Sequence, residues 1–342
     1  MAVRIKDIAE KAGVSEGAVR KALHGYAGTA RVGKETTKKI RDIAAQMRYR
    51  PNLVARQLAG GQNRVIGVII DSIPPSVHLS RLDAIEAEVA KYEYRLIVGQ
   101  SHGQASRVED YLRDFAGRRI DALLYVSHHG NNPQVDDVLT DWQSDFRTIV
   151  FIGRVLGDIS TRSSYSVNVD RAEGIRLAVE HLLDRGKSRV GLIINKNLGY
   201  TTQQRLDGYT QAMSARNMEV KPGLIQYLKS AKSIDQRVAP VVDTLINDHH
   251  VDAIIAHNDY FAFAAINQLR RMNLRVPQDV AVIGFDNIEA AELFYPPLTT
   301  IDQNVKLTAK TAIRMLMDLL EDKKVRDRHI QLSPKLVIRE SS

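Results

Sequence analysis

The chain has 342 residues and contains no cysteine. This absence excludes disulfides, thiol chemistry and cysteine-ligated zinc. The ten histidines do not fall in any metal-ligand spacing, so we expect neither a metal nor a cofactor. No apolar run is long enough to cross a bilayer, and the segment from Met1 to Glu10 lacks the apolar core of a signal peptide. We therefore expect a protein of the cytoplasm with no membrane partner.

The sequence also lacks the short motifs of common enzymes. It contains no G-x-x-x-x-G-K-S/T, G-x-S-x-G or H-E-x-x-H segment, and no pair of carboxylates has a supporting motif. Hydrophobic residues make up 44% of the chain and charged residues 26%, which is ordinary for a globular protein with two or three domains. We therefore expect a protein that is not an enzyme.

Positive charge is concentrated at one end of the chain. Residues 1–64 contain 14 lysines and arginines against 5 acidic residues, whereas the rest of the chain contains 34 against 35. A short basic head on a charge-balanced body is typical of a nucleic-acid-binding module attached to another domain. Charge alone would equally suit a solvated basic surface, so the order of residues in the head has to decide.

The head shows the pattern of a helix-turn-helix. Apolar residues recur at helical spacing from Ile5 to Ala12, and Gly13 suits a left-handed turn position. Ser15 is a good N-cap for a second helix over residues 16–23, which would lie in the major groove of DNA. Residues 40–47 have the spacing of a third helix that closes the core.

A short additional helix is predicted after this head. Pro51 ends the third helix, Asn52 can cap a new one, and Gly60 and Gly61 stop it. So few residues do not form a stable isolated helix in water, and this hinge segment should therefore need outside support.

The remainder of the chain alternates short β-rich runs with amphipathic segments. This alternation predicts parallel sheets covered by helices on both faces. A restart of the pattern in the second half indicates two doubly wound lobes, with a ligand cleft at the carboxyl ends of the strands. The predicted strands are 64–71, 96–98, 122–126 and 148–152 in the first set, and 190–194, 253–256 and 280–283 in the second.

Several motifs together resemble the lactose-repressor/galactose-repressor (LacI/GalR) family. The resemblance covers essentially the whole chain, and its motifs occur in the family's order. In the head they are 5–9 (IKDIA), 12–15 (AGVS) and 49–59; in the body they include 258–262 (NDYFA), 275–280 (RVPQDV) and 284–286 (GFD).

The resemblance implies an all-α helix-turn-helix head plus hinge helix, joined to a two-lobed, periplasmic-binding-protein-like α/β body with doubly wound parallel sheets. The expected domains are a DNA-binding domain at 1–50, a hinge helix and linker at 51–64, and an effector-binding and dimerisation domain at 65–342. Within the body, lobe one is expected at about 65–162 plus 292–323, and lobe two at about 163–291 plus 324–340.

The same resemblance implies which residues contact DNA. Leu58 matches a leucine that wedges into the central minor-groove step and kinks the duplex. Arg20 and Lys21 suit guanine or phosphate, and Glu16 could accept from cytosine N4. Arg4, Gly17, Arg20 and His24 depart from the family pattern, so the operator sequence cannot be copied from other members. The expected DNA-binding residues are Lys6, Ser15, Glu16, Gly17, Arg20, Lys21, His24, Asn52, Ala55 and Leu58.

Three residues match the family's effector site. Arg205, Asn258 and Asp286 supply a bidentate donor, an amide and a carboxylate, which suit the vicinal hydroxyls of a sugar. Helix capping is the alternative role for the Asn258-Asp259 pair, and we expect Asp259 to be the capping residue. Ser76, His78 and Arg154 are further candidates. Because Gly153 replaces an aspartate common in the family, Arg154 and Arg205 also suggest an anionic or acidic-sugar effector.

The leading hypothesis is a sequence-specific transcriptional regulator, expected to repress carbohydrate-related genes under the control of a sugar-like effector. Because two hinge helices must be held together on DNA, we expect a homodimer on a pseudopalindromic operator in the bacterial nucleoid. The chain stops soon after Arg339, so we expect no tetramer. The alternative is a two-lobed solute-binding protein without a regulatory role, which the basic head disfavours.

Overall fold

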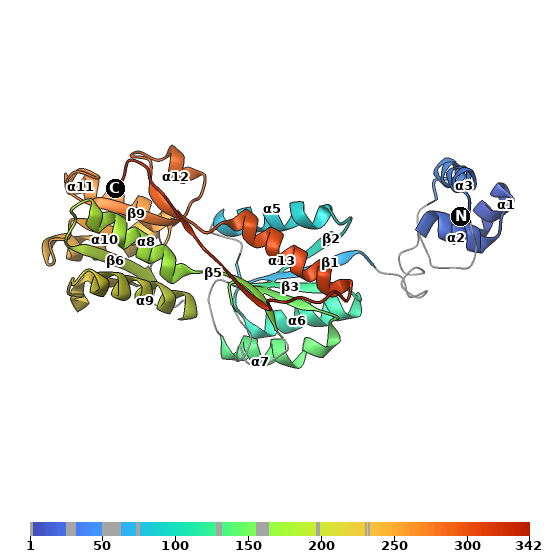
Figure 1. Ribbon diagram of the computed structural model, residues 1–342, viewed down its shortest axis with the longest axis horizontal. Coiled ribbons are helices and arrows are strands. Elements are labelled where there is room, and N and C mark those ends of the chain that lie inside the picture. The colour runs from blue at the N-terminus through green and yellow to red at the C-terminus, as the bar shows by residue number, and fades with distance from the viewer. Residues whose placement is uncertain are drawn as a thin grey trace. The chain divides into compact units, whose positions relative to one another are not determined.

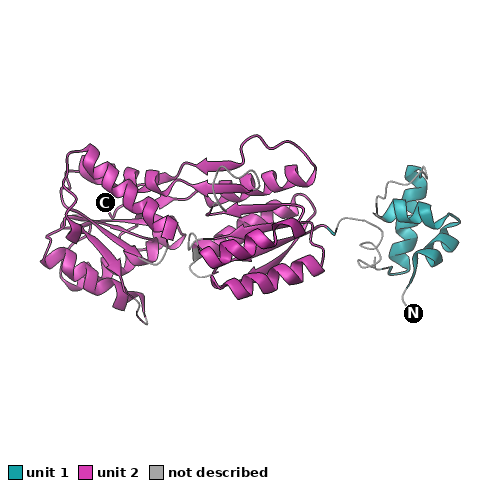
Figure 2. Ribbon diagram, turned by 90° about the horizontal axis from the view of Figure 1, so that it is seen from below, with its two compact units in different colours: residues 1–63 teal, residues 64–342 magenta. Residues whose placement is uncertain are grey.

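The structure is a computed structural model in which the chain forms two compact units, residues 1–63 and 64–342 (Figure 2). The residues that the structure describes are 3–24, 32–49, 63–72, 76–127, 132–154, 164–195, 199–229, 231 and 233–342.

The first unit is a small three-helix fold made of α1 (Ile5–Ala12), α2 (Glu16–His24) and α3 (Lys34–Gln46). Ile8, Val19 and Ile40, one from each helix, are completely buried and form the centre of its core. The turn between α1 and α2 depends on Gly13, whose φ of 70° lies in the left-handed region that favours glycine. The predicted helix-turn-helix is therefore present.

The second unit contains two six-stranded sheets. The first sheet has the order β11-β5-β4-β3-β1-β2, and all of its strand pairs are parallel. The strand β1, which lies between β3 and β2, is an apolar run that is buried along most of its length, as expected for a strand covered on both faces. The strands are β1 (Val65–Ile70), β2 (Arg95–Gln100), β3 (Ala122–Val126), β4 (Ile149–Ile152), β5 (Tyr165–Val169) and β11 (His329–Leu332).

Helices cover both faces of this first sheet. The helices α5 (Ser76–Ala90) and α13 (Val305–Leu320) lie side by side on one face (Figure 1). The other face is covered by α6 (Ala105–Gly117) and α7 (Pro133–Asp141). A 3-10 turn at Gln143–Asp145 follows α7.

The second sheet has the order β12-β10-β9-β8-β6-β7. It is parallel except at its edge, where β12 runs antiparallel to β10, so the expectation of a purely parallel sheet is corrected at this strand. The edge position tolerates this reversal because β12 pairs on one side only. The strands are β6 (Val190–Asn195), β7 (Ile225–Leu228), β8 (Ala253–Ala256), β9 (Ala281–Asp286), β10 (Thr299–Asp302) and β12 (Lys335–Val337).

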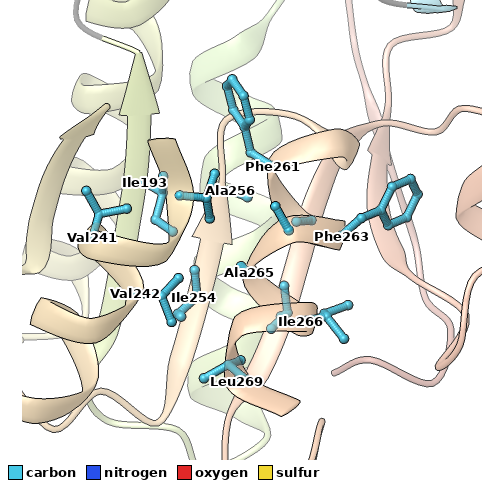
Figure 3. Packing of buried hydrophobic residues seen from close by; sticks show 14 of the residues in the cluster. Ile193, Val241, Val242, Ile254, Ala256, Phe261, Phe263, Ala265, Ile266 and Leu269 are labelled. Atoms are coloured by element: carbon cyan, nitrogen blue, oxygen red, sulfur yellow. The ribbon is translucent and has the colours of Figure 1, made fainter. Parts of the chain in front are cut away.

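Four helices sandwich the second sheet. On one face lie α8 (Arg171–Asp184) and α9 (Gly199–Ala215), and on the other lie α10 (Ile234–Asn247) and α11 (Asp259–Arg271). Figure 3 shows the second of these cores, where Ile254 of β8 faces Val242 of α10 and Ile266 of α11. The short elements α12 (Ala290–Leu293) and a 3-10 turn at Pro222–Leu224 complete the lobe.

The predicted lobe boundaries are wrong at three strands. β5 and β11 were expected in lobe two, but they extend the first sheet, because β5 pairs with β4 and β11 pairs with β5. β10 was expected in lobe one, but it pairs with β9 in the second sheet. These strands are short and partly polar, so their own sequence does not indicate which sheet edge they join; pairing at an otherwise open edge decides it.

The two lobes also touch at the start of α5. Val77 is buried and belongs to the hydrophobic core of the second lobe, although the rest of α5 packs on the first sheet with α13. The beginning of α5 therefore contacts both lobes of the second unit.

Candidate nucleic-acid interface and effector site

The exposed face of α2 carries the residues expected to read DNA. The Ser15 hydroxyl accepts a hydrogen bond from the Ala18 backbone N–H at 3.2 Å, so Ser15 is the predicted N-cap. Glu16 and Arg20 form an ion pair at 3.3 Å, and both side chains are about half exposed. A Cβ added at Gly17 would make an ordinary van der Waals contact with Ser15 Oγ at 3.8 Å, so this position has room for a side chain.

The other DNA-binding candidates lie around this helix or outside the described residues. Lys6, on α1, is largely exposed and approaches Glu10 at 4.0 Å, while Lys21 and His24 lie on α2. In place of a capping side chain at Arg4, the Asp7 carboxylate accepts from the Arg4 backbone N–H at 2.8 Å. The predicted hinge residues Asn52, Ala55 and Leu58 lie outside the described residues.

In the second unit, Asp286 is the centre of a buried polar cluster. It is the last residue of β9, is 8% exposed and has a φ of 128°, a conformation that non-glycine residues rarely adopt. Its carboxylate accepts a hydrogen bond from the side-chain amide of Gln303, which lies between β10 and α13. Backbone conformations of this kind cluster at functional sites.

Three buried arginines interact electrostatically with this carboxylate. They are Arg81 of α5, Arg171 of α8 and Arg205 of α9, each at most 4% exposed. Burial lowers the pKa of Arg205 to about 10, and the negative charge of Asp286 opposes this shift. Burial together with the positive charges of Arg205 and Arg81 lowers the pKa of Arg171 to about 9. The guanidinium groups are therefore close enough to repel one another.

The pKa of Asp286 responds mainly to its burial. Burial raises this pKa and the neighbouring Asp259 carboxylate raises it further, while Arg205, Gln303 and Arg81 act in the opposite direction. The cluster thus contains three cationic arginines and the carboxyl group of Asp286. Burial disfavours the negative charge of that carboxyl group.

We expected Asp259 to cap the helix, but the capping residue is Asn258. The Asn258 side chain accepts from the Phe261 backbone N–H at 2.9 Å and caps α11. Asp259 is completely buried and accepts from the Ile288 backbone N–H at 2.9 Å and from the Thr300 hydroxyl. An N-cap has extended backbone, as Asn258 has, whereas Asp259 already lies inside the helix. Asn258 therefore uses its side-chain oxygen for capping.

Arg154 belongs to a second polar group, in the first lobe. It forms an ion pair with Asp136 of α7 and lies over the Tyr125 ring, 5.5 Å from its centroid. The preceding Gly153 has a φ of 85°, and a Cβ there would lie 1.9 Å from the Ser127 carbonyl oxygen. The backbone therefore requires glycine where the resemblance led us to look for aspartate.

His78 joins the Asp286 cluster through Arg81. It is buried, and its Nδ1 lies 3.4 Å from an Arg81 terminal nitrogen. Ser76 is the first residue of α5. The structure thus brings His78, Arg205 and Asp286 together with Arg81 and Arg171, and it places Arg154 in the other group.

Arg81, Arg171 and Gln303 were missed from the sequence. For Arg81 a signal exists, because it lies four residues from Val77 and from Ile85, on the stripe of α5 that is buried. A charged residue on an apolar helix face needs a partner or a function. Arg171 and Gln303 follow the ends of short polar strands, and no spacing marks them.

The described residues contain neither a membrane-spanning helix nor a group of metal ligands. No helix there is long and apolar enough to cross a membrane. In the same part of the chain, no group of three histidine, cysteine, aspartate or glutamate side chains is placed to hold a metal ion.

A helix-turn-helix unit joined to a body of two doubly wound lobes defines the class of DNA-binding regulators that carry a periplasmic-binding-protein-like domain. Family models agree: residues 4–52 match "Bacterial regulatory proteins, lacI family" and residues 179–342 match "Periplasmic binding protein-like domain".

Relatives that match over almost the full length of the chain identify its family. The HTH-type transcriptional repressor PurR of Photobacterium profundum is 30% identical, with 98% of each chain covered. That of Vibrio cholerae serotype O1 is 28% identical, covering 98% of this chain and 97% of the relative. The Lac repressor dimer bound to operator and the anti-inducer ONPF has the same fold, with a TM-score of 0.83, 24% identity and coverage of 100% and 99%. The chain belongs to the lacI family and is a DNA-binding transcriptional repressor.

Proposed function

We propose that this repressor acts as a homodimer on a pseudopalindromic operator and controls carbohydrate-related genes in response to a small sugar-like effector. The observation that carries this proposal is that buried Arg205 interacts electrostatically with buried Asp286, which ends β9 at the carboxyl end of the sheet. A carboxylate that accepts from hydroxyls and a guanidinium that donates to them suit a polyol. Ligands of parallel α/β sheets bind at this end of the strands.

In this proposal α2 reads the major groove and the hinge supports it. The Glu16–Arg20 ion pair, half exposed on α2, would open on DNA so that Arg20 contacts guanine or phosphate. Leu58 would wedge into the central minor-groove step, with Asn52 and Ala55 beside it. The Lac repressor structure of the same fold is a dimer bound to operator, which supports two such heads on a symmetric site.

Effector control would act through α5 and β1. The chain enters the body at β1, directly after residues 63 and 64, and α5 follows in sequence. Because the start of α5 contacts both lobes, an effector bound beside it would favour one arrangement of the lobes and so change the affinity of the heads for DNA. This function requires no cofactor and no catalysis.

The DNA-binding part is tested by selecting duplexes with the full chain from a random library. We expect one pseudopalindromic sequence to be enriched and its affinity to fall steeply as salt rises. The variant Arg20→Ala should lose about tenfold or more on that sequence, because a base contact is worth ~1–3 kcal/mol. Arg113→Ala, which removes a 62% exposed arginine of α6 in the body, is the control and should bind normally. Failure to bind any duplex would contradict the proposal.

The effector part is tested by thermal stabilisation with a panel of sugars and sugar acids. A bound effector stabilises the folded state by mass action, so it raises the melting temperature and shifts operator affinity. Asp286→Ala should abolish both responses. A sugar that stabilises this variant as strongly as the wild type would show that the effector binds elsewhere.

A further inference from the structure

The three buried arginines around Asp286 lack negatively charged partners. Among the described residues, no carboxylate oxygen lies within 4.0 Å of a nitrogen of Arg81, Arg171 or Arg205. Arginines elsewhere in the body, such as Arg154 and Arg176, do have such partners. Buried charges are normally paired, because removing an unpaired charge from water is costly.

Their hydrogen bonds are also incomplete. A guanidinium carries five N–H donors. Arg205 donates to the Thr201 carbonyl at 3.0 Å, and Arg171 donates to the Val169 carbonyl and the Gln204 side chain, both at 3.4 Å. The Nε atoms of Arg81 and of Arg205 are buried without any partner in the described part of the chain. Within the described ranges, the cluster therefore has N–H donors without an acceptor and positive charge without a negative partner.

A neutral sugar would not satisfy this environment. Hydroxyl oxygens can accept some of the free N–H groups, but they supply no charge against the repulsion that lowers the pKa of Arg171. An oxyanion supplies both, because phosphate and carboxylate oxygens match the planar fork of a guanidinium in charge and geometry. Asp286 would repel such a group if it were ionised and close, so it suits a hydroxyl of the same ligand.

We propose that Arg81, Arg171 and Arg205 bind an oxyanion group of the effector, either a phosphate ester or a pair of carboxylates, while Asp286 holds a hydroxyl. The inference rests on the effector-controlled repressor proposed above and names the chemical class of its effector.

The three arginines come from both lobes, so an anion bound to all of them would affect how the two lobes are arranged. Arg81 lies on α5, which packs with α13 on the first sheet, whereas Arg171 and Arg205 lie on α8 and α9 of the second lobe. In the free protein these like charges repel one another. An oxyanion shared by all three removes the repulsion and joins the two lobes at the point where α5 already touches both. Effector charge would thereby set the lobe arrangement.

The test compares matched probes on the full chain: glucose, gluconate, glucose 6-phosphate, citrate and inorganic phosphate. Binding is measured by calorimetry and by the shift in melting temperature, at constant ionic strength. We expect citrate and the phosphate-bearing probes to bind more tightly than glucose, and Arg81→Gln and Arg171→Gln each to weaken them roughly tenfold. Arg113→Gln, an exposed arginine paired with Glu109 at 2.9 Å, is the matched control and should leave binding unchanged.

A second readout shows whether the variants are folded. Because Arg171 is repelled by Arg205 and Arg81, Arg171→Gln should raise the melting temperature of the free protein while it loses the anion response. Arg171→Lys keeps the charge but loses the planar fork, so it should bind the phosphate probes more weakly than the wild type and more tightly than Arg171→Gln.

The outcomes separate this inference from the proposed function. If no anionic probe binds the wild type more tightly than the arginine variants, the oxyanion site is wrong. A chain that binds its operator and responds only to neutral sugars keeps the repressor function and overturns the oxyanion site. A chain that binds anions through these arginines but selects no duplex overturns the proposed function instead.

Discussion

Two buried carboxylates, Asp71 and Asp286, lie at the carboxyl ends of strands in the two lobes but have opposite surroundings. Asp71 directly follows β1 of the first sheet, and Asp286 ends β9 of the second. Asp71 accepts from the hydroxyls of Tyr125 at 2.8 Å and Ser127 at 2.7 Å, and from Ser101 at 3.4 Å. Asp286 accepts only the Gln303 amide from the described residues and faces guanidinium groups that it does not pair with directly.

This difference separates a structural carboxylate from one that serves a ligand. The donors around Asp71 come from the end of β3 and from the residue after β2, so the fold itself satisfies this carboxylate. Around Asp286, buried donors and charges remain unsatisfied. Unsatisfied buried groups reduce the stability of the free protein and become favourable only when a ligand pairs with them. Variants of the two residues should therefore behave in opposite ways.

The largest expected effect is that of Asp71→Ala. It would leave the Tyr125 and Ser127 hydroxyls buried without an acceptor, and it would remove a negative charge near Arg154. We expect the free energy of unfolding to fall by about 3 kcal/mol, measured by denaturant titration. A loss below about 1 kcal/mol would show that the Asp71 network does not stabilise the lobe.

The pH dependence of stability should come from Asp286 and its neighbour Asp259. Burial raises the pKa values of Asp286 and Asp259 in the folded protein. Between the unfolded pKa and the raised folded pKa, the folded state binds more protons. The stability contributed by these groups is therefore full below about pH 4 and is lost as the pH rises, by about 2–4 kcal/mol between about pH 4 and 7. Asp286→Asn should flatten this slope in melting experiments, whereas an unchanged slope would contradict the assignment.

A smaller effect is expected from Tyr125→Phe, which removes one donor to Asp71. The carboxylate keeps the Ser127 and Ser101 hydroxyls, so we expect a loss of about 1 kcal/mol. The side chain also packs against Phe151, and phenylalanine preserves that contact. A loss as large as that of Asp71→Ala would mean that Tyr125 alone holds the network.

The smallest effect on the free protein should be that of Asp286→Asn. Because burial favours the neutral carboxyl of Asp286, replacing it with an amide should change the free energy of unfolding by less than about 1 kcal/mol at about pH 4, where this carboxyl is protonated in the folded protein. The same variant should lose its response to the effector. A large destabilisation would make Asp286 a structural carboxylate like Asp71 and would remove the contrast between them.

The sequence alone determined much of this molecule. The spacing of apolar residues from Ile5 to Ala12, with Gly13 and Ser15 after them, was sufficient to predict the helix-turn-helix, because capping and turn chemistry are local. The strands at 122–126 and 253–256 were predicted with their observed bounds, since continuous apolar runs of this length mark buried strands. The motifs at 258–262 and 284–286 located Asp286 before its surroundings were known.

Only the tertiary structure decided which segments come together. The sheet membership of β5, β10 and β11 depends on which edge they pair with, and short polar strands carry no signal of that. The cluster of Arg81, Arg171 and Arg205 joins α5 to the distant helices α8 and α9, and its unpaired charge exists only once the three side chains are buried together. The exchange of roles between Asn258 and Asp259 turned on a helix start that differed by one residue. Burial and proximity, which are properties of the fold, turn separate polar residues into a site.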